Sequence, residues 1–518
     1  VTIWAEDRWC QTAGNSYIPI PFLLSSAGYA LFLNRYEAAR FDLGHSDPDC
    51  AVLTQHDAPL DLYVSVADAP QNVLTDFTAL WGEPAVPPAW GFGMLVSRHT
   101  RTREFATPEG IIGMSRQMDQ HHLPWSGAII EGWPTYDTSR YDELKAVVRK
   151  LHSRDKKVLV YDACGRMRKS LADEEGATDS YLVHDKNGNT AVQEAPHFNP
   201  EDAPDRRASQ FLDITNPKAR NWWKDTVWAP LLDGVGVDGA KIDFCEQFPE
   251  DDHIRLASGD SPKGMHHEYP TRYNTMMHDL FNRRRDTGGV CWSRGGSTGA
   301  HLYPFVWCGD QRREFEFLDA ILRAILSAGL SGIPFMGHDL GGYVPAQNDD
   351  DEGAVFARGV ELACFTATMS THGTVTRPYD FPENIVHIYR TYSRIRYAIM
   401  PYITAQAELC RKTGAPLVRH LFLDYPEEPA ARDCDDEFLF GSDLLAAPVL
   451  DNRDERDVWL PPGKWEDLNS RETLEGGRRL EAYPAPLERI PLFAQTAATE
   501  TGSQAAQTIA KTLKHAFA

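Results

Sequence analysis

The sequence predicts an α/β protein built around a (β/α)8 TIM barrel, flanked by an N-terminal β-sandwich portion and a C-terminal β-sandwich domain. Three observations support this fold class. Short apolar runs alternate with helical patterns from residue 90 onward, which is typical of parallel strands joined by crossover helices. The number of these runs is close to eight. Alternating β-type patterns lie on both sides of this region.

Residues 1–85 are predicted to form the N-terminal β-sandwich portion, which we expect to be truncated. Its apolar or alternating runs, at residues 17–24, 29–34 and 60–66, are separated by Gly, Ser, Asp and Pro. The proline-rich residues 83–89 suit an extended linker, so they mark the boundary with the barrel.

Residues 86–424 are predicted to form the barrel. Its candidate strands are residues 90–96, 127–130, 157–161, 236–244, 288–292, 305–307, 332–336 and 417–423. Helical patterns lie between most of them, at residues 108–121, 141–153, 217–232, 269–285, 315–329 and 382–410. Two longer inserts, residues 164–213 and 338–354, follow the third and seventh strands, where barrels carry substrate-shaping loops.

The pattern becomes β-type again after the barrel. Residues 425–503 contain short apolar runs at 438–449 and 456–460, and a Pro-Pro-Gly-Lys-Trp465 turn leads into another strand. This region is predicted to form the C-terminal β-sandwich. Residues 504–518 are predicted to form a loose amphipathic helix or a frayed tail.

Composition and charge favour a folded enzyme or binding protein with an uncharged partner. The 518 residues carry a formal net charge of −22, which disfavours nucleic acid and anionic membrane as partners. We see no apolar run of about 18 residues and no basic-then-apolar start, so we expect neither a membrane span nor a signal peptide. Nine cysteines without paired Cys-x-x-Cys spacing favour reduced thiols and a cytoplasmic location over a disulfide framework or a zinc site.

A buried strand that ends in carboxylates is the first candidate functional feature. Residues 237–244 form an apolar run in which Gly239 and Ala240 allow close packing, as in an inner parallel strand. Asp243 would then lie at the carboxyl end of this strand, where barrels place functional side chains. A strand-end aspartate can equally cap the next helix or form a turn.

A second stretch, residues 291–311, offers Arg294 at a strand end, a glycine-rich turn, and then Asp310 after another short apolar strand. Two carboxylates on strands of one barrel can converge. Cleavage of a glycosidic bond needs such a pair, because one carboxylate attacks or stabilises the anomeric carbon and the other protonates the leaving oxygen. Asp310 alone could also be a turn former beside Gly309.

Four motifs, in order along the chain, together resemble glycoside hydrolase family 31. They are Lys241-Ile-Asp-Phe-Cys-Glu246, Arg294 with Gly-Ser-Thr-Gly299, Trp307-Cys-Gly-Asp-Gln311, and Leu330-Ser-Gly-Ile-Pro-Phe-Met-Gly-His-Asp-Leu-Gly-Gly342. The resemblance extends from about residue 12 to about residue 492. The family contains α-glucosidases, α-xylosidases, sulfoquinovosidases and some α-galactosidases.

The resemblance implies roles for five residues. Asp243 matches the nucleophile, which forms a covalent glycosyl-enzyme with retention of the α configuration, and Asp310 matches the general acid/base. Their carboxyl groups should then stand about 5–5.5 Å apart. Arg294 matches an arginine that contacts the sugar and helps to hold Asp243 ionised, whereas Asp310 needs a raised pKa. His338 matches a histidine that binds sugar hydroxyls, with Asp339 beside it orienting the loop.

Two aromatic residues and a lysine match further parts of the sugar subsite. Trp307 and Phe335 match its apolar walls, although a Trp or Phe at a strand end is more often part of a core. Lys241 resembles the lysine of the α-xylosidase branch. It could bind a sugar hydroxyl or only neutralise the acidic cluster.

Three acidic residues complete the candidate set. Glu131 occupies the strand end where family members usually place an aspartate that holds the far hydroxyls of the sugar, which leaves room for xylose, galactose or a substituted sugar. Asp162 is a candidate substrate contact in a segment that departs from the family pattern. Asp7 lies where the N-terminal domain of the family lends an acid to the site.

The leading hypothesis is a retaining exo-α-glycosidase that cleaves a terminal α-xyloside, α-galactoside or α-glucoside by double displacement, without a cofactor or metal. Its partner would be an α-linked oligosaccharide or glycoside. A sulfoquinovosidase, an α-glucan lyase and a transglycosylase are alternatives on the same scaffold. The presence of Asp243, Asp310, Arg294 and His338 together argues against a catalytically silent sugar-binding protein.

Two further questions stay open at this point. A phosphate-binding barrel enzyme would need a glycine-rich loop after the seventh or eighth strand, and the pair at 341–342 is a candidate. The acidic balance and the His338–Asp339 pair fit a sugar better. Family relatives are often oligomeric, so a homo-oligomer is an option.

Overall fold

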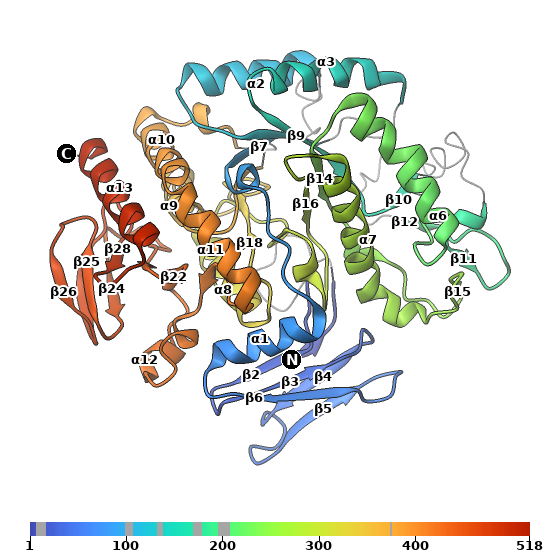
Figure 1. The fold of residues 1–518 in the computed structure, drawn as a ribbon, viewed down its shortest axis with the longest axis horizontal. Helices are drawn as coiled ribbons and strands as arrows, with labels where there is room; N and C mark the ends of the chain where they lie inside the picture. Colours follow the sequence, from blue (N-terminus) through green and yellow to red (C-terminus); the bar gives the residue numbers. More distant parts are fainter. Residues whose placement is uncertain are drawn as a thin grey trace.

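The computed structural model describes residues 1–6, 17–98, 107–131, 138–168, 179–194, 208–372 and 376–517. Figure 1 shows a central sheet ringed by helices, with the N-terminal β-structure below it and the C-terminal β-structure at its left side. The predicted α/β fold class, a barrel between two β-rich regions, is confirmed.

The barrel is a sheet of parallel strands. In chain order they are β7 (Met94–Arg98), β8 (Gly127–Ile130), β9 (Lys157–Asp162), β14 (Gly239–Ile242), β16 (Val290–Ser293), β17 (Phe305–Trp307), β18 (Met336–Gly337), β19 (Asp339–Leu340) and β20 (Met369–Thr371). Their order in the sheet is β18-β17-β16-β14-β9-β8-β7-β20-β19. β18 pairs with β17 and β19 pairs with β20, so these two short strands, separated only by His338, act as the seventh strand and close the ring.

The predicted eighth strand, residues 417–423, is wrong. β21 (Val418–Arg419) instead pairs antiparallel with β22 (Phe438–Phe440) of the C-terminal sheet, and η9 (Leu421–Leu423) is a short 3-10 helix. The eighth strand is β20, which pairs with β7. Its Ser370 and Thr371 are polar but buried, so the pattern of apolar residues did not reveal it.

Helices pack around the barrel. They are α2 (Pro108–Gln120), α3 (Tyr141–His152), α6 (Pro217–Trp222) with its π-helical continuations η4 (Trp223–Trp228) and η5 (Pro230–Val235), α7 (Pro262–Arg284), α8 (Phe315–Leu330), α9 (Glu352–Cys364), α10 (Glu383–Ala398) and α11 (Met400–Thr413). The sequence analysis missed α9, where Asp351 caps the first turn by accepting from the backbone N–H groups of Gly353 and Ala354.

The insert after β9 contributes strands to two small antiparallel sheets beside the barrel, one of which also contains a strand that follows β14. β10 (Arg166–Arg168), β13 (Ala208–Phe211) and β12 (Gln193–Glu194) form one sheet, and β11 (His184–Asp185) pairs with β15 (Ile254–Arg255). In Figure 1 these strands lie at the right side of the barrel, next to α6 and α7.

The N-terminal region contains two three-stranded sheets. One consists of β1 (Thr2–Ile3), β4 (Ala39–Leu43) and β5 (Ala51–Gln55), and the other of β2 (Phe22–Ser25), β3 (Tyr29–Leu33) and β6 (Leu62–Val66). A helix that the sequence analysis missed, α1 (Pro70–Trp81), covers the second sheet. Its Phe77 packs edge-on against Phe22 and Phe32.

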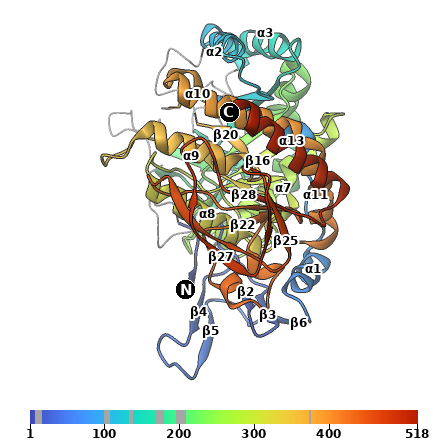
Figure 2. The same ribbon diagram turned by 90° about the vertical axis from the view of Figure 1, so that its left-hand side faces the viewer.

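The C-terminal region is mainly β-structure, as predicted. Its six-stranded sheet joins β21 and β22 to β23 (Leu444–Ala446), β28 (Leu492–Gln495), β25 (Lys464–Asp467) and β26 (Thr473–Glu475), while β24 (Glu455–Leu460) pairs with β27 (Arg478–Pro484). The short α12 (Pro429–Arg432) precedes the sheet. Figure 2 shows this sheet with α13 (Glu500–Ala516) lying beside α10 and α11. Because α13 buries Ile509 and Leu513, it is docked and not frayed.

The sequence predicts no membrane-spanning segment, and the structure tests this prediction for helices. In the part of the chain that the structure describes, no helix is long and apolar enough to cross a bilayer.

Candidate active site

The candidate catalytic residues meet at the carboxyl ends of neighbouring strands. Asp243 directly follows β14, Arg294 directly follows β16, and Asp310 lies in the loop after β17. Because β14, β16 and β17 are adjacent in the sheet, their ends bring the three side chains together. The position of β14 depends on Gly239, since a Cβ there would collide with the backbone carbonyl of Val290 on β16.

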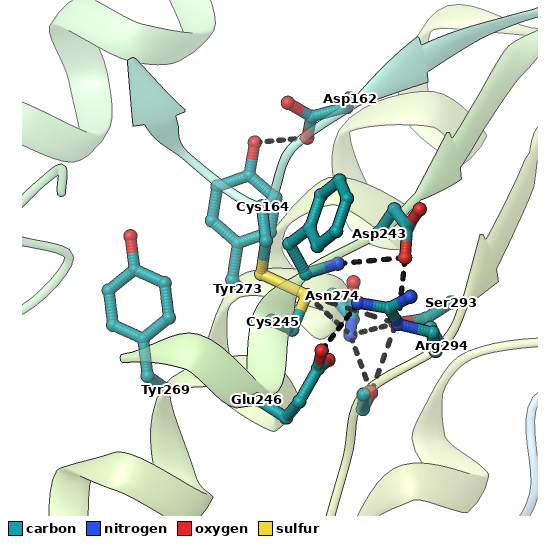
Figure 3. The surroundings of a disulfide bond; sticks show 12 residues. Asp162, Cys164, Asp243, Cys245, Glu246, Tyr269, Tyr273, Asn274, Ser293 and Arg294 are labelled. Atoms are coloured by element: carbon teal, nitrogen blue, oxygen red, sulfur yellow. Dashed lines mark hydrogen bonds and ion pairs between the residues drawn. A yellow bond between two sulfur atoms is a disulfide. The ribbon is translucent and has the colours of Figure 1, made fainter. Parts of the chain in front are cut away.

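Arg294 joins three carboxylates. Its side chain is fully buried, and its Nε lies 2.8 Å from Asp243 Oδ1. Its Nη1 lies 3.3 Å from Asp310 Oδ2, and its Nη2 lies 2.5 Å from Glu246 Oε1. Figure 3 shows the guanidinium between Asp243 and Glu246. The two predicted catalytic carboxylates are therefore connected through one cation, which offsets part of their mutual repulsion.

The carboxylate of Asp243 is held in a fixed orientation. Tyr161, on β9, donates its hydroxyl to Oδ2 at 2.6 Å, and the backbone N–H of Phe244 donates to Oδ1 at 2.9 Å. The ring of Phe244 lies 4.6 Å from the Arg294 guanidinium carbon, a cation–π contact. Sequence reasoning missed Tyr161, because an aromatic residue within a barrel strand looks like part of the core.

Asp310 has a different environment from Asp243. Burial raises its pKa, the nearby Arg294 lowers it, and the negative charge of Asp243 raises it again, with a net value of about 6. A carboxyl group with this pKa is protonated in a far larger fraction of molecules near neutral pH than an ordinary aspartate is. Asp310 is therefore better suited than Asp243 to donate a proton.

A second charged cluster lies beside the first. Lys241, two residues before Asp243 on β14, places its Nζ 3.2 Å from Glu131 and 3.4 Å from Asp339. Burial alone would lower the pKa of Lys241, but the carboxylates of Asp339, Glu131 and Asp243 raise it well above its ordinary value, so the side chain is charged. Its ammonium also lies 4.7 Å from the ring centre of Trp307.

Glu131 is held by three donors at the end of β8. Ser97 donates its hydroxyl to Oε1 at 2.7 Å, Lys241 approaches the same oxygen, and His372 Nε2 lies 3.2 Å from Oε2. Burial lowers the pKa of His372, but Glu131 and Asp339 raise it to a net value above the ordinary one. His372 follows β20 and was missed because that strand was not recognised. A polar histidine just after the buried Met-Ser-Thr run of β20 is the signal that could have located it.

The structure contradicts the expectation that the cysteines are reduced. Cys164 and Cys245 form a disulfide bond that links the turn after β9 to the turn after β14. Figure 3 shows this bond next to Asp243 and Glu246. This bond could not be predicted from the sequence, since the two cysteines are 81 residues apart and become neighbours only because β9 and β14 pair.

Asp162, the last residue of β9, is buried and accepts a hydrogen bond of 2.5 Å from the Tyr273 hydroxyl on α7. Tyr273 in turn accepts a hydrogen bond from the Trp223 indole N–H at 2.9 Å. Asp162 also lies beside Asp243 in the backbone ladder, because its carbonyl accepts from the Asp243 N–H at 2.9 Å.

His338, Phe335 and Asp7 are the remaining predicted site residues. His338 is buried, burial lowers its pKa to about 4, and no described residue hydrogen bonds to its ring nitrogens. The structure thus joins His372, and not His338, to the charged cluster. Phe335 packs against Phe92 near the amino ends of the strands, which favours the core interpretation for this residue. Asp7 lies outside the described residues.

Comparisons with known proteins agree with this architecture. A model of the glycosyl hydrolases family 31 TIM-barrel domain matches residues 84–406, and a model of the glycosyl hydrolase family 31 C-terminal domain matches residues 414–498. An isomaltosyltransferase from Sporosarcina globispora is 24% identical over 95% of this chain and 48% of its own length. An α-xylosidase from Lactiplantibacillus pentosus is 27% identical over 93% of this chain and 62% of its own length.

A solved structure, the cycloalternan-forming enzyme from Listeria monocytogenes, superposes with a TM-score of 0.86 at 23% identity, covering 96% of this chain and 50% of that one. The chain thus spans between about half and two thirds of the length of these relatives. Since the family models match the barrel and the C-terminal region together, this chain belongs to glycoside hydrolase family 31.

Proposed function

We propose that this protein is a retaining exo-α-glycosidase that cleaves a terminal α-linked sugar by double displacement. The observation that carries this proposal is the contact of Arg294 with both Asp243 and Asp310 at neighbouring strand ends. Two carboxyl groups that share one site but have unlike surroundings can divide the roles of nucleophile and proton donor.

Asp243 is the proposed nucleophile. Its carboxylate pairs with the Arg294 guanidinium and accepts a hydrogen bond from the Tyr161 hydroxyl, so the group that would attack the anomeric carbon is held in a fixed orientation. Attack breaks the glycosidic bond and forms a glycosyl ester on Asp243. Water then attacks the same carbon from the opposite side, so the released sugar keeps the α configuration.

Asp310 is the proposed acid/base. Its raised pKa of about 6 supports a protonated carboxyl that delivers its proton to the departing oxygen in the first step. Once it has lost that proton, the same carboxylate can accept one from the attacking water in the second step. The net result is hydrolysis, and an acceptor sugar in place of water would give transglycosylation.

The cluster around Glu131 supports an uncharged sugar as substrate. The buried cations Lys241 and Arg294 are already paired with carboxylates, so neither offers an unmatched charge to a sulfonate. Hydroxyl groups, in contrast, can both donate to Glu131 and accept from Lys241 without adding net charge. Among the candidate sugars we therefore favour xylose, galactose or glucose over sulfoquinovose.

The test is a set of initial rates on p-nitrophenyl α-glycosides of glucose, xylose, galactose, N-acetylgalactosamine and sulfoquinovose. We expect one neutral sugar to be preferred and the Asp243→Ala variant to lose more than about a thousandfold in kcat. The Glu131→Asp variant should change the order of preference among the sugars. No turnover of any glycoside by the wild-type protein, or full activity in Asp243→Ala, would contradict the proposal.

A further inference from the structure

The disulfide bond lies directly behind the candidate catalytic residues. Each cysteine is two residues beyond a strand-end aspartate, Cys164 after Asp162 and Cys245 after Asp243. The ladder between β9 and β14 ends at the hydrogen bond from the Asp243 N–H to the Asp162 carbonyl, at 2.9 Å. The disulfide therefore links the two turns just beyond the last backbone hydrogen bond between β9 and β14.

The backbone on either side of this bond has an unusual conformation. Phe244 has a φ of 60° and Cys164 a φ of 57°, in the left-handed region that residues other than glycine seldom adopt. Such conformations persist when the surrounding structure holds them in place. Phe244 is also the residue whose N–H donates to the Asp243 carboxylate, so a change in this turn would alter the orientation of that carboxylate.

Cys245 also lies, in sequence, between Asp243 and Glu246, two of the three acids that contact Arg294. It begins η6 (Cys245–Gln247), and its neighbour Glu246 pairs with Arg294 through the shortest of the three contacts. Its Cβ packs against the turn after β16, since a Cβ added at Gly295 would lie 2.7 Å from it. Movement of the turn after β14 would thus change two of the three carboxylate partners of Arg294, Asp243 and Glu246, at once.

We propose that the Cys164–Cys245 disulfide is a positioning element for Asp243 and Arg294, so that a dithiol which opens the bond lowers turnover while the barrel stays folded. This inference rests on the proposed glycosidase function. In the reaction, one thiolate of dithiothreitol attacks a sulfur of the bond, which forms a mixed disulfide and releases the first protein thiol. Its second thiol then closes the ring, which releases the second protein thiol and leaves the dithiol oxidised.

The two turns can loosen without loss of the barrel. β9 and β14 pair with each other through four residues and each pairs with a further strand on its other side. These ladders hold the strands whether or not the bond is closed. Opening the disulfide should therefore have a local effect. Because a displacement of about 1 Å at a reacting group can lower the rate about a hundredfold, we expect this effect to be a lower kcat.

The test begins with peptide mapping of the unreduced protein, which should yield a linked peptide containing Cys164 and Cys245. The double variant Cys164→Ala/Cys245→Ala is then compared with wild type and with Cys364→Ala, which removes a buried free thiol from α9. On the preferred glycoside we expect kcat of the double variant to fall at least about tenfold with KM within about twofold. Cys364→Ala should keep the wild-type kcat.

Hydrogen exchange gives a readout that does not depend on activity. In the double variant, and in wild type after dithiothreitol, we expect faster exchange in residues 243–247 and unchanged exchange in β22 and β23 of the C-terminal sheet. Reoxidation of the wild-type protein should restore both kcat and slow exchange. This reversible route keeps the test valid if the double variant does not fold.

Several results would overturn the inference. They are the absence of the linked peptide, an unchanged kcat with unchanged exchange at residues 243–247 after reduction, and a loss of kcat that occurs only together with unfolding of the whole chain. A wild-type protein that turns over no glycoside would instead overturn the proposed function, and the exchange of residues 243–247 would then still decide whether the bond positions this turn.

Discussion

At the scale of single residues, two aspartates on one barrel differ because of what surrounds them. Asp243 pairs with Arg294 at 2.8 Å and accepts the Tyr161 hydroxyl, whereas the partly buried Asp310 accepts a longer hydrogen bond, of 3.3 Å, from Arg294. The motifs of the sequence identified both residues and Arg294. They did not reveal Tyr161, which looks like a core residue of β9, or His372, which follows the unrecognised strand β20.

The raised pKa of Asp310 predicts the alkaline limb of the pH profile. Burial and Asp243 move the pKa of this acid up to about 6, so its protonated fraction falls as the pH rises through that value. We expect kcat/KM for a p-nitrophenyl glycoside to decrease above about pH 6, and the limb to disappear in Asp310→Asn, whose residual activity is low. A wild-type profile that stays flat from pH 5 to pH 8 would contradict the role of Asp310.

At the scale of elements, the strands with clear apolar runs were predictable and the polar ones were not. β8 and β17 were predicted with the bounds that the structure shows. β20 was missed because its buried Ser370 and Thr371 look like a loop, and α9 was missed with it. The apolar residues 417–423 were taken for the eighth strand because an apolar run indicates burial but does not indicate which sheet is formed.

The tight packing of β14 leads to a prediction about this strand. A methyl group at Gly239 would meet the carbonyl of Val290, and the φ of 154° at this position also disfavours other residues. We expect Gly239→Ala to lower the free energy of unfolding by about 1–3 kcal/mol and to reduce kcat, because β14 carries Asp243. Urea denaturation and initial rates measure the two effects.

The matched control is Gly113→Ala in α2, where an added Cβ meets nothing within 4 Å. Alanine is a better helix former than glycine, so this variant should be as stable as wild type or more stable, by up to about 1 kcal/mol. Equal effects of the two substitutions on the free energy of unfolding would show that the close contact between residue 239 and the Val290 carbonyl does not determine how well β14 packs.

At the scale of the whole molecule, the barrel and the C-terminal sheet are joined by a buried charged group. Arg358 on α9 donates to the carbonyls of Arg453, Ala485 and Pro486 in the C-terminal region, and it pairs with Glu361 at 3.1 Å. The fold class was predictable because both regions have clear patterns. This junction was not, since nothing in the sequence shows that α9 exists or which carbonyls it faces.

Glu361 predicts how stability depends on pH. Burial raises its pKa to about 8, although Arg358 lowers it in part. A raised folded-state pKa contributes stability that is present below the ordinary value near 4.5 and is lost as the pH rises through 8. We expect the Tm of Glu361→Gln to rise relative to that of wild type between about pH 5 and pH 8, and the difference to stay constant above pH 8. A Tm difference that stays constant between about pH 5 and pH 8 would contradict this assignment.

The disulfide bond bears on where the whole protein is located. Disulfide bonds are uncommon in cytosolic proteins, so the Cys164–Cys245 bond favours an oxidising compartment over the predicted cytoplasmic location. The location itself stays a prediction.

The central claim is the division of roles between Asp243 and Asp310, and azide rescue tests it most directly. The substrate is the 2,4-dinitrophenyl α-glycoside of the preferred sugar, whose leaving group needs no proton. In Asp243→Ala, azide should attack from the vacated face and give the β-glycosyl azide. In Asp310→Ala, azide should attack the glycosyl-enzyme from the other face and give the α-glycosyl azide. Two results would contradict this division of roles: the same anomer of the glycosyl azide from both variants, or turnover by Asp243→Ala at the wild-type rate without azide.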